Sequence, residues 1–153
     1  MTDGISLLKA DHAKVKALFK ECEALGNGAH SSRRKIFEQI DRELSLHALV
    51  EEKIFYPAFK AKTKSASDER DEVLEAYEEH ACVKDLIAKL EALDPSDETY
   101  KAKIQVLSEL VTHHVHEEET VLFKEARELL SKDELVTLGE QITEMKAEQS
   151  ALA

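Results

Sequence analysis

Two histidine–glutamate pairs with identical spacing are the residues of this 153-residue sequence best suited to chemistry. Glu51 follows His47 by four residues, and Glu118 follows His114 by four residues. Residues four apart on an α-helix lie one turn apart and about 40° around the axis, so both members of each pair face the same side. Imidazole and carboxylate ligands together suit iron and manganese. A single pair with this spacing is also a common surface ion pair, so further residues must decide between the two interpretations.

An internal repeat includes these pairs. The chain matches itself at an offset of 67 or 68 residues, at polar as well as apolar positions. The match aligns three polar residues of the first half with residues of the same type in the second half: His12 with His80, His47 with His114, and Glu51 with Glu118. Each half therefore supplies one histidine and then one His-x-x-x-Glu motif, which predicts a pseudo-twofold molecule with a polar cluster near its middle.

Long helices are expected to position these residues. The sequence has 4 Gly, 2 Pro and no Trp, beside many Ala, Leu, Glu and Lys residues, and this composition favours helices over strands. We expect the Gly26–Gly28 segment to end the first helix with positive φ angles, and Pro57 to kink or end the second helix. The expected starts of the four helices are Asp3, Ser31 or Ser32, Ser65 or Ser67, and Pro95.

Short loops between these helices predict an all-α fold, an up-down-up-down antiparallel four-helix bundle formed by residues 1–130. Ser131 and Glu134 have the spacing of a capping box, which predicts a short C-terminal fifth helix over residues 132–149. We expect residues 131–153 to pack on the bundle or to extend from it.

The repeated polar residues interrupt apolar stripes that should face the core of the bundle. His12, for example, lies between Leu8 and Val15, and positions 47 and 51 lie on the face that carries Leu44 and Ile54. Burying ionised carboxylates is costly unless they are paired or bind a metal. A dinuclear metal centre, in which two carboxylates bridge two ions, would compensate for all six interruptions; a hydrogen-bonded His/Glu network without metal is the alternative. The predicted metal ligands are His12, His47, Glu51, His80, His114 and Glu118.

A second His-x-x-x-Glu motif, formed by His113 and Glu117, competes with the pair that begins one residue later. Its face turns polar at Lys124, and His113 aligns with Leu46 rather than with a histidine in the repeat. We therefore prefer the later register.

Several other polar residues lie near the predicted ligands. Glu52 and Glu119 lie about 100° around the helix from the glutamates that precede them, so we expect them to support the ligands from outside or to face solvent. His116 points about 200° away from His114 and is expected to be exposed or to flank the site. His30 is expected in a loop.

Taken in order, the four motifs resemble the signature of the hemerythrin-like family, also called HHE cation-binding domains, over about residues 3–127. The resemblance implies a non-haem di-iron centre with two iron ions, bridged by Glu51 and Glu118 and by an oxo or hydroxo group. His12 and His47 would serve one iron, and His80 and His114 the other. It implies binding of dioxygen, nitric oxide or peroxide for sensing, storage or carriage. The alternative is a di-iron enzyme that decomposes hydrogen peroxide, as a catalase does, or handles oxidative or nitrosative stress.

The sequence departs from oxygen-carrying members of that family at two points. Ala76 stands where they have an additional histidine, one turn before His80, and the last carboxylate is Glu118 at a spacing of four rather than an aspartate at five. The departure predicts an open coordination position and a site suited to redox chemistry. Tyr77 could fill that position, or it could pack without ligation.

Charge and cysteine content limit the partners. Lys and Arg total 21 against 32 Asp and Glu, a net charge of −11, so we expect neither nucleic acid nor a membrane as partner. The expected partner is a small diatomic ligand or peroxide, and the oligomeric state stays open. Cys22 and Cys82 have no CxxC spacing, which argues against a disulfide framework or a thiolate zinc site. The absence of a leader-like or membrane-spanning run predicts a cytoplasmic protein.

Overall fold

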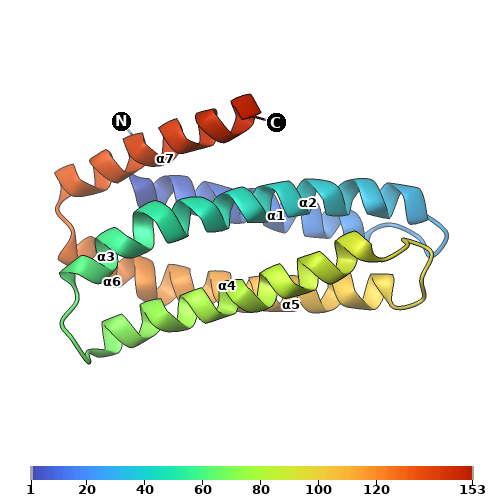
Figure 1. The fold of residues 1–153 in the computed structure, drawn as a ribbon, viewed down its shortest axis with the longest axis horizontal. Helices are drawn as coiled ribbons and strands as arrows, with labels where there is room; N and C mark the ends of the chain where they lie inside the picture. Colours follow the sequence, from blue (N-terminus) through green and yellow to red (C-terminus); the bar gives the residue numbers. More distant parts are fainter. Residues whose placement is uncertain (1, 153) are drawn as a thin grey trace.

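The helices pack as an antiparallel bundle in the computed structural model, which describes residues 2–152, and no strand occurs within that range (Figure 1). Four long rods form the bundle: α1; α2 continued by η1 and α3; α4; and α5 continued by η2 and α6. A fifth helix, α7, lies across one side. The all-α bundle with a C-terminal fifth helix is therefore confirmed. The bounds are α1 (Gly4–Glu23), α2 (His30–Val50), η1 (Glu51–Phe55), α3 (Tyr56–Lys62), α4 (Asp68–Ala92), α5 (Tyr100–Glu117), η2 (Glu118–Leu122), α6 (Phe123–Leu129) and α7 (Lys132–Leu152).

Side-chain caps begin three of these helices as expected: Asp3 caps α1, Ser67 caps α4 by accepting from the Arg70 amide at 3.2 Å, and Ser131 caps α7. The carboxylate of Asp3 accepts a hydrogen bond from the Ser6 amide at 2.8 Å. Ser131 and Glu134 form the reciprocal capping box, with distances of 2.9 and 3.1 Å between amide nitrogens and side-chain oxygens. Each cap satisfies amides that the first helical turn would leave without partners.

The end of α1 differs from expectation. No glycine among the described residues has a positive φ; Ala66, at 55°, is the non-glycine residue that does. Instead, the buried guanidinium of Arg33 donates to the carbonyl of Gly26 at 2.7 Å and approaches that of Leu25 at 3.5 Å. An arginine from the next helix thus satisfies carbonyls that a glycine cap would leave to backbone amides. Helix α2 begins at His30, one residue earlier than expected and at a residue expected in a loop.

Two π-helical turns, η1 and η2, interrupt the long rods at matching positions of the repeat. The amide of Tyr56 donates to the carbonyl of Glu51, and the amide of Phe123 donates to that of Glu118. Each π turn spaces its bonds five residues apart, so the helix is wound more loosely than an α-helix and the buried face shifts by one residue. Pro57 does not cause the turn, because η2 has the same turn without a proline. The expected kink at Pro57 is therefore a π turn that precedes it.

The apolar core forms two clusters, one toward each end of the bundle. One cluster gathers around Phe55, Phe59 and Phe123, and the other around Phe37 and Tyr100. Along every rod, the predicted polar ligands lie between the stretch that joins the first cluster and the stretch that joins the second. The polar cluster therefore divides the core near its middle.

Helix α7 packs against α1 and α2 (Figure 1). It buries Leu135, Leu138 and Ile142 in the first apolar cluster. Gly139 makes a close approach possible, because a Cβ atom at this position would lie 2.3 Å from the carbonyl oxygen of Thr2. A larger residue would push the helix away from the start of the chain.

Candidate metal centre

The structure brings all six predicted ligand residues together at mid-bundle. The histidines come from α1, α2, α4 and α5, and each glutamate is the first residue of a π turn. Relative exposures are 0% for Glu51, 2% for Glu118 and 5–7% for the four histidines. Their ligand atoms form two groups, and the atoms of each group lie within 4.8 Å of one another. Both groups include both glutamates; His12 and His47 complete one group, and His80 and His114 complete the other.

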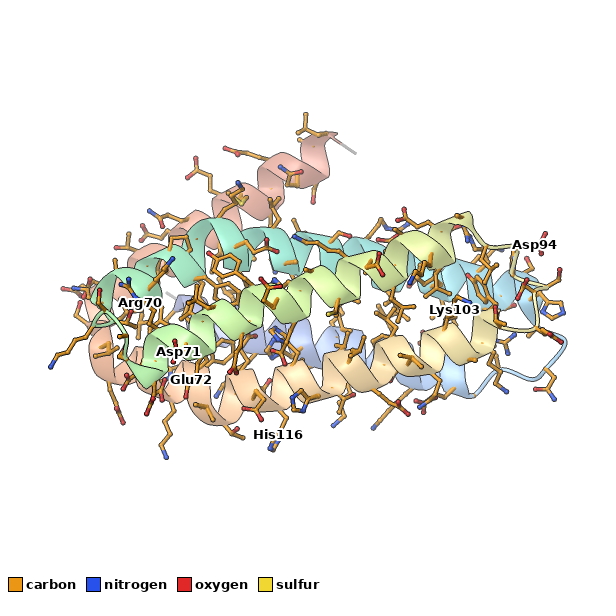
Figure 2. The ribbon with its side chains drawn as sticks, turned by 60° about the horizontal axis from the view of Figure 1, so that its bottom comes forward. Arg70, Asp71, Glu72, Asp94, Lys103 and His116 are labelled. Atoms are coloured by element: carbon orange, nitrogen blue, oxygen red, sulfur yellow. The ribbon has the colours of Figure 1, made fainter. Side chains whose placement is uncertain are left out.

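The competing residues lie outside this cluster. His113 and Glu117 are both exposed, so the register that begins at His114 is the one that faces the core. His116 is exposed and points outward from α5 (Figure 2). These placements agree with the helical-wheel argument from the sequence.

Each glutamate reaches histidines of both halves of the chain. Glu51 Oε1 lies 3.0 Å from His47 Nε2 and 3.2 Å from His80 Nε2. Glu118 approaches His12 Nε2 at 3.0 Å through Oε1 and His114 Nε2 at 3.2 Å through Oε2. This is the arrangement in which two carboxylates can span a pair of cations.

The other ring nitrogen of every histidine contacts a carboxylate outside the cluster. Four such contacts, between 2.6 and 3.0 Å, hold the imidazoles with Nε2 directed inward. Such partners fix the ring orientation and tautomer of a metal-binding histidine. The pairs are His12 with Glu119, His47 with Asp11, His80 with Glu52, and His114 with Glu79.

These outer carboxylates follow the internal repeat. Glu52 and Glu119 are repeat-equivalent, as are Asp11 and Glu79. Sequence reasoning placed Glu52 and Glu119 near the ligands and missed Asp11 and Glu79. Each missed residue immediately precedes a predicted histidine ligand, which places it near the site, but the histidine that it supports lies on another helix.

Tyr56 is the site residue that sequence reasoning missed altogether. Its buried hydroxyl lies 3.2 Å from Glu51 Oε1, 3.2 Å from His80 Nε2 and 3.4 Å from His114 Nε2, and it donates a short hydrogen bond to Glu118 Oε2. An unbroken α-helix would turn a residue five positions after Glu51 well away from it, and the π turn brings the two side chains together.

Tyr77, the tyrosine singled out from the sequence, does not reach the cluster. Its hydroxyl lies 3.4 Å from the main-chain oxygen of Glu52, and its ring packs edge-on against that of Tyr56, with centroids 5.2 Å apart. Tyr77 therefore packs behind the tyrosine that occupies the site. In the other half, Phe123 is the repeat counterpart of Tyr56 and stacks on the His12 ring at 5.6 Å.

Several of the buried histidines and glutamates of the cluster stabilise each other's charged forms, which shifts their pKa values. Burial opposes charge on His47, but the carboxylates of Glu51, Asp11 and Glu118 outweigh burial and raise its pKa well above the usual value. Against burial, the neighbouring carboxylates raise the pKa of His114 to about 12. Burial and the Glu51 charge oppose ionisation of Glu118, yet the surrounding imidazoles lower its pKa to about 2. Protons on these imidazoles thus balance the buried carboxylates, and they are what a bound cation would replace.

The donor set fits a pair of cations on structural grounds. Glu51 Oε2 and Glu118 Oε1 are buried and have no hydrogen-bond partner in the described part of the chain, although Glu118 Oε1 lies near His12 Nε2. Buried carboxylate oxygens without donors are destabilising, and cation binding would satisfy them. Four imidazole nitrogens and two carboxylates, with no thiolate, match the preferences of iron or manganese.

Two cavities adjoin the cluster. One, of about 210 Å³, touches all four histidines and is otherwise walled mainly by apolar side chains such as Val15, Ile87 and Val111. The other, of about 150 Å³, is polar and extends past Ala76 to Glu72, a residue near the start of α4 (Figure 2). The small side chain of Ala76 lines this second cavity, where oxygen-carrying relatives were expected to have a histidine.

A helical bundle with a buried cluster of four histidines and two glutamates is typical of proteins that bind metal cations in the bundle core. The family model described as the hemerythrin HHE cation binding domain matches residues 3–126. The chain belongs to this family, which confirms the resemblance seen in the sequence. The individual ligand roles remain predictions.

Two known proteins are similar to the chain. A protein named DNA nickase from Nostoc sp. (strain PCC 7120) is 31% identical over 146 residues, which cover 95% of this chain and 39% of that relative. The chain thus spans about two-fifths of its length. The crystal structure of a hemerythrin HHE cation binding domain-containing protein from Mycobacterium kansasii has a TM-score of 0.82, is 24% identical, and matches 99% of this chain and 90% of its own. The second similarity supports the fold.

Within the described residues, no helix has the length and apolar character needed to cross a membrane. The expectation that nucleic acid is not a partner rests on net charge alone. It stays a prediction, because the similar Nostoc protein is named a DNA nickase.

Proposed function

We propose that this chain binds two iron ions in the buried cluster, and that dioxygen, nitric oxide or peroxide binds there for sensing, storage or carriage. The observation that most supports ligand binding is the apolar cavity of about 210 Å³ in contact with all four histidines. Its size and its walls suit a small molecule of low polarity next to a polar centre. The proposed ligands of the metal ions are His12, His47, Glu51, His80, His114 and Glu118.

When bound, the iron ions would supply electron transfer and coordination of a small ligand, which the side chains alone cannot provide. The side chains contribute orientation and exclusion of water. The outer carboxylates keep each Nε2 directed inward, and the valine and isoleucine side chains give the cavity apolar walls that disfavour water. Tyr56 holds a proton at its hydroxyl beside Glu118.

Decomposition of hydrogen peroxide is a second candidate function, and the Tyr56 hydroxyl specifically favours it. Cleavage of peroxide into water and oxygen requires protons to be moved between oxygen atoms, and a phenol at hydrogen-bonding distance from four site residues can donate or accept one. A carrier has no such requirement.

One experiment separates the two functions. Apoprotein is loaded anaerobically with ferrous iron, its metal content is measured, and the visible spectrum is followed after addition of oxygen, nitric oxide or peroxide. A reversible spectral change with oxygen or nitric oxide supports binding. Oxygen evolution from peroxide, measured with an electrode, supports turnover. Fewer than two metal ions per chain at saturation would contradict both.

DNA cleavage is not part of the proposal, because its basis is the name of a relative of which this chain matches 39%. The net charge of −11 also opposes contact with a phosphate backbone. Nicking of supercoiled plasmid by the iron-loaded protein, abolished by a chelator, would contradict this exclusion.

A further inference from the structure

Two of the four outer carboxylates are themselves held by a lysine. Lys84, on α4, lies 2.7 Å from Glu52, the partner of His80. Lys146, on α7, pairs with Asp11, the partner of His47. The side chain of Asp11 is only 12% exposed and that of Lys146 26%, so this second ion pair is more sheltered than the Lys84 pair.

The Lys146 contact has no equivalent in the repeat. Among residues 2–152, the charged partners of Glu79, the counterpart of Asp11, are its histidine partner and the exposed His113, at 3.6 Å. Helix α7 itself lies outside the repeated segments. Helix α7, which is added to the four-helix bundle, therefore provides this lysine contact only to the half of the cluster that contains His47.

The packing of α7 fixes where Lys146 lies. Leu138 and Ile142 are buried in the core on the same side of the helix, and Met145 packs against that core. Gly139 sets the approach of the helix to Thr2. Lys146 lies one turn beyond Ile142, so docking of the apolar face also places the ammonium group at Asp11.

A chain of contacts thus runs from α7 into the cluster. Lys146 contacts Asp11 Oδ1, and Asp11 Oδ2 lies 2.9 Å from Nδ1 of His47. Because the two oxygens of one carboxylate serve the two partners, the lysine fixes the orientation of the oxygen that holds the imidazole. The Nε2 atom of His47 then lies 3.0 Å from Glu51.

We infer that Lys146 is a positioning residue for His47, and that docking of α7 thereby sets the metal affinity of the half of the cluster formed by His12 and His47. The inference rests on the proposed function. Carboxylates behind metal-binding histidines typically contribute 10- to 100-fold in metal affinity, and a lysine one contact further out should contribute less, roughly 3- to 10-fold.

The test is titration of apoprotein with cobalt(II), followed by its visible absorption, in Lys146→Gln, Lys146→Arg and wild type. Lys146→Gln should weaken one of two binding steps by roughly 3- to 10-fold, and Lys146→Arg, which keeps the cation, should restore most of the loss. Lys132→Gln, an exposed lysine at the start of α7, serves as the matched control and should leave both steps unchanged. Lys84→Gln should weaken a step of its own, so that its effect adds to that of Lys146→Gln.

A double-mutant cycle with Asp11→Asn distinguishes positioning from general stabilisation by α7. In the Asp11→Asn background, Lys146→Gln should cause no further loss of cobalt affinity. An equal loss in both backgrounds, or unchanged affinity in Lys146→Gln with the apoprotein still melting cooperatively, would overturn the inference. If Lys146→Gln unfolds the apoprotein, failure of Lys146→Arg to bind as wild type does would overturn it. Absence of cobalt and iron binding in the wild type would instead overturn the proposed function.

Discussion

The two ring nitrogens of each histidine in the cluster have different partners. Nδ1 meets a carboxylate at the edge of the bundle and Nε2 meets one at its centre, in all four cases. The inner and outer carboxylates should therefore differ in what their loss does.

Replacement of the inner glutamates is the first prediction. Glu51→Gln or Glu118→Gln removes a charge that contacts histidines of both halves, so binding of both metal ions should be lost. Glu52→Gln and Glu119→Gln alter only the support of one histidine each, so two ions should still bind, about 10- to 100-fold more weakly. Metal analysis after anaerobic loading and dialysis measures this. Equal losses in all four variants would contradict the division.

Tyr56→Phe is the second prediction. The change removes the hydroxyl, keeps the ring in its buried place, and removes one of the two groups that contact Glu118 Oε2, the other being His114 Nε2. The apoprotein should lose about 1–3 kcal/mol of unfolding free energy, measured by denaturant titration. Any visible band of the iron-loaded protein that depends on a phenolate should disappear in Tyr56→Phe. Tyr77→Phe is the matched control and should change neither quantity appreciably.

The third prediction concerns pH. His47 and His114 have raised pKa values in the folded apoprotein, so their stabilising contribution is complete below about pH 6.5 and is lost as the pH rises toward the folded values. Glu118 has a lowered pKa, so its contribution is complete above about pH 4.5 and is lost as the pH falls toward about 2.

The apoprotein should therefore melt at its highest temperature near pH 5–6 and at lower temperatures toward pH 9. Stabilisation by metal should change in the opposite direction, because cations displace the imidazole protons. Thermal melts with and without cobalt(II) across this range measure both trends. An apoprotein Tm that rises steadily from pH 6 to pH 9 would contradict the charge assignment.

At the scale of the elements, the parts of the fold that repeat with helical period were predictable. The caps at Asp3 and Ser131, the four long rods and the inward face of His114 all follow from spacing in units of one turn. The π turns were not predictable in the same way. A single extra residue in one turn leaves the composition of the helix unchanged, and it shifts by one residue the positions that face the core after that turn. Tyr56 was missed for this reason alone.

Contacts made across the fold were also beyond spacing arguments. Arg33 replaces the expected glycine cap through a guanidinium from the next helix, and Asp11 and Glu79 support histidines of other helices. To predict each of these contacts, one must know which helices are neighbours and how far each is shifted along the bundle axis relative to the next. The exposed His113 and the buried His114, in contrast, could be distinguished from the repeat itself.

Deletion of Lys53 is the fourth prediction and tests the π turn. Lys53 is an exposed residue of η1, and its removal would place Tyr56 four residues after Glu51, the spacing at which an unbroken α-helix keeps two side chains on one face. Tyr56 and Phe59 should therefore stay in the core, so the variant should unfold cooperatively and still bind two metal ions. Deletion of Gly28, at an open position in the first loop, should be tolerated. Loss of cooperative unfolding or of metal binding in the Lys53 deletion would show that the π turn itself is required.

At the scale of the whole molecule, the two inner glutamates connect the two helix hairpins. Each hairpin supplies two histidines and one glutamate, and both groups of ligand atoms need both glutamates. A pair of ions held in this way would cross-link the halves of the chain.

The fifth prediction follows from that cross-link. A protease site inserted between Lys64 and Ser65, in the exposed loop between the hairpins, allows the chain to be cut. The cut protein should melt at a higher temperature with metal than without, because each bound ion adds about 2.7 kcal/mol of stability at a metal concentration 100 times its Kd. The same insertion left uncut is the control. Equal melting of the cut protein with metal and with chelator would show that the halves are not joined through the cluster.

The two repeats differ at one position beside the cluster, where the first has Tyr56 and the second has Phe123. This difference has a consequence for the order in which metal ions would bind. The half next to His80 faces a hydroxyl, while the half next to His12 faces a flat hydrocarbon ring. Two ions held by matching histidines and shared carboxylates would then differ in acidity and in affinity for hard, oxygen-loving metals. We expect such a pair to fill in sequence rather than together, and to hold two unlike metals in a defined order. Limiting supplies of iron and manganese offered at once should yield a mixed iron–manganese form, with the harder ion on the tyrosine side.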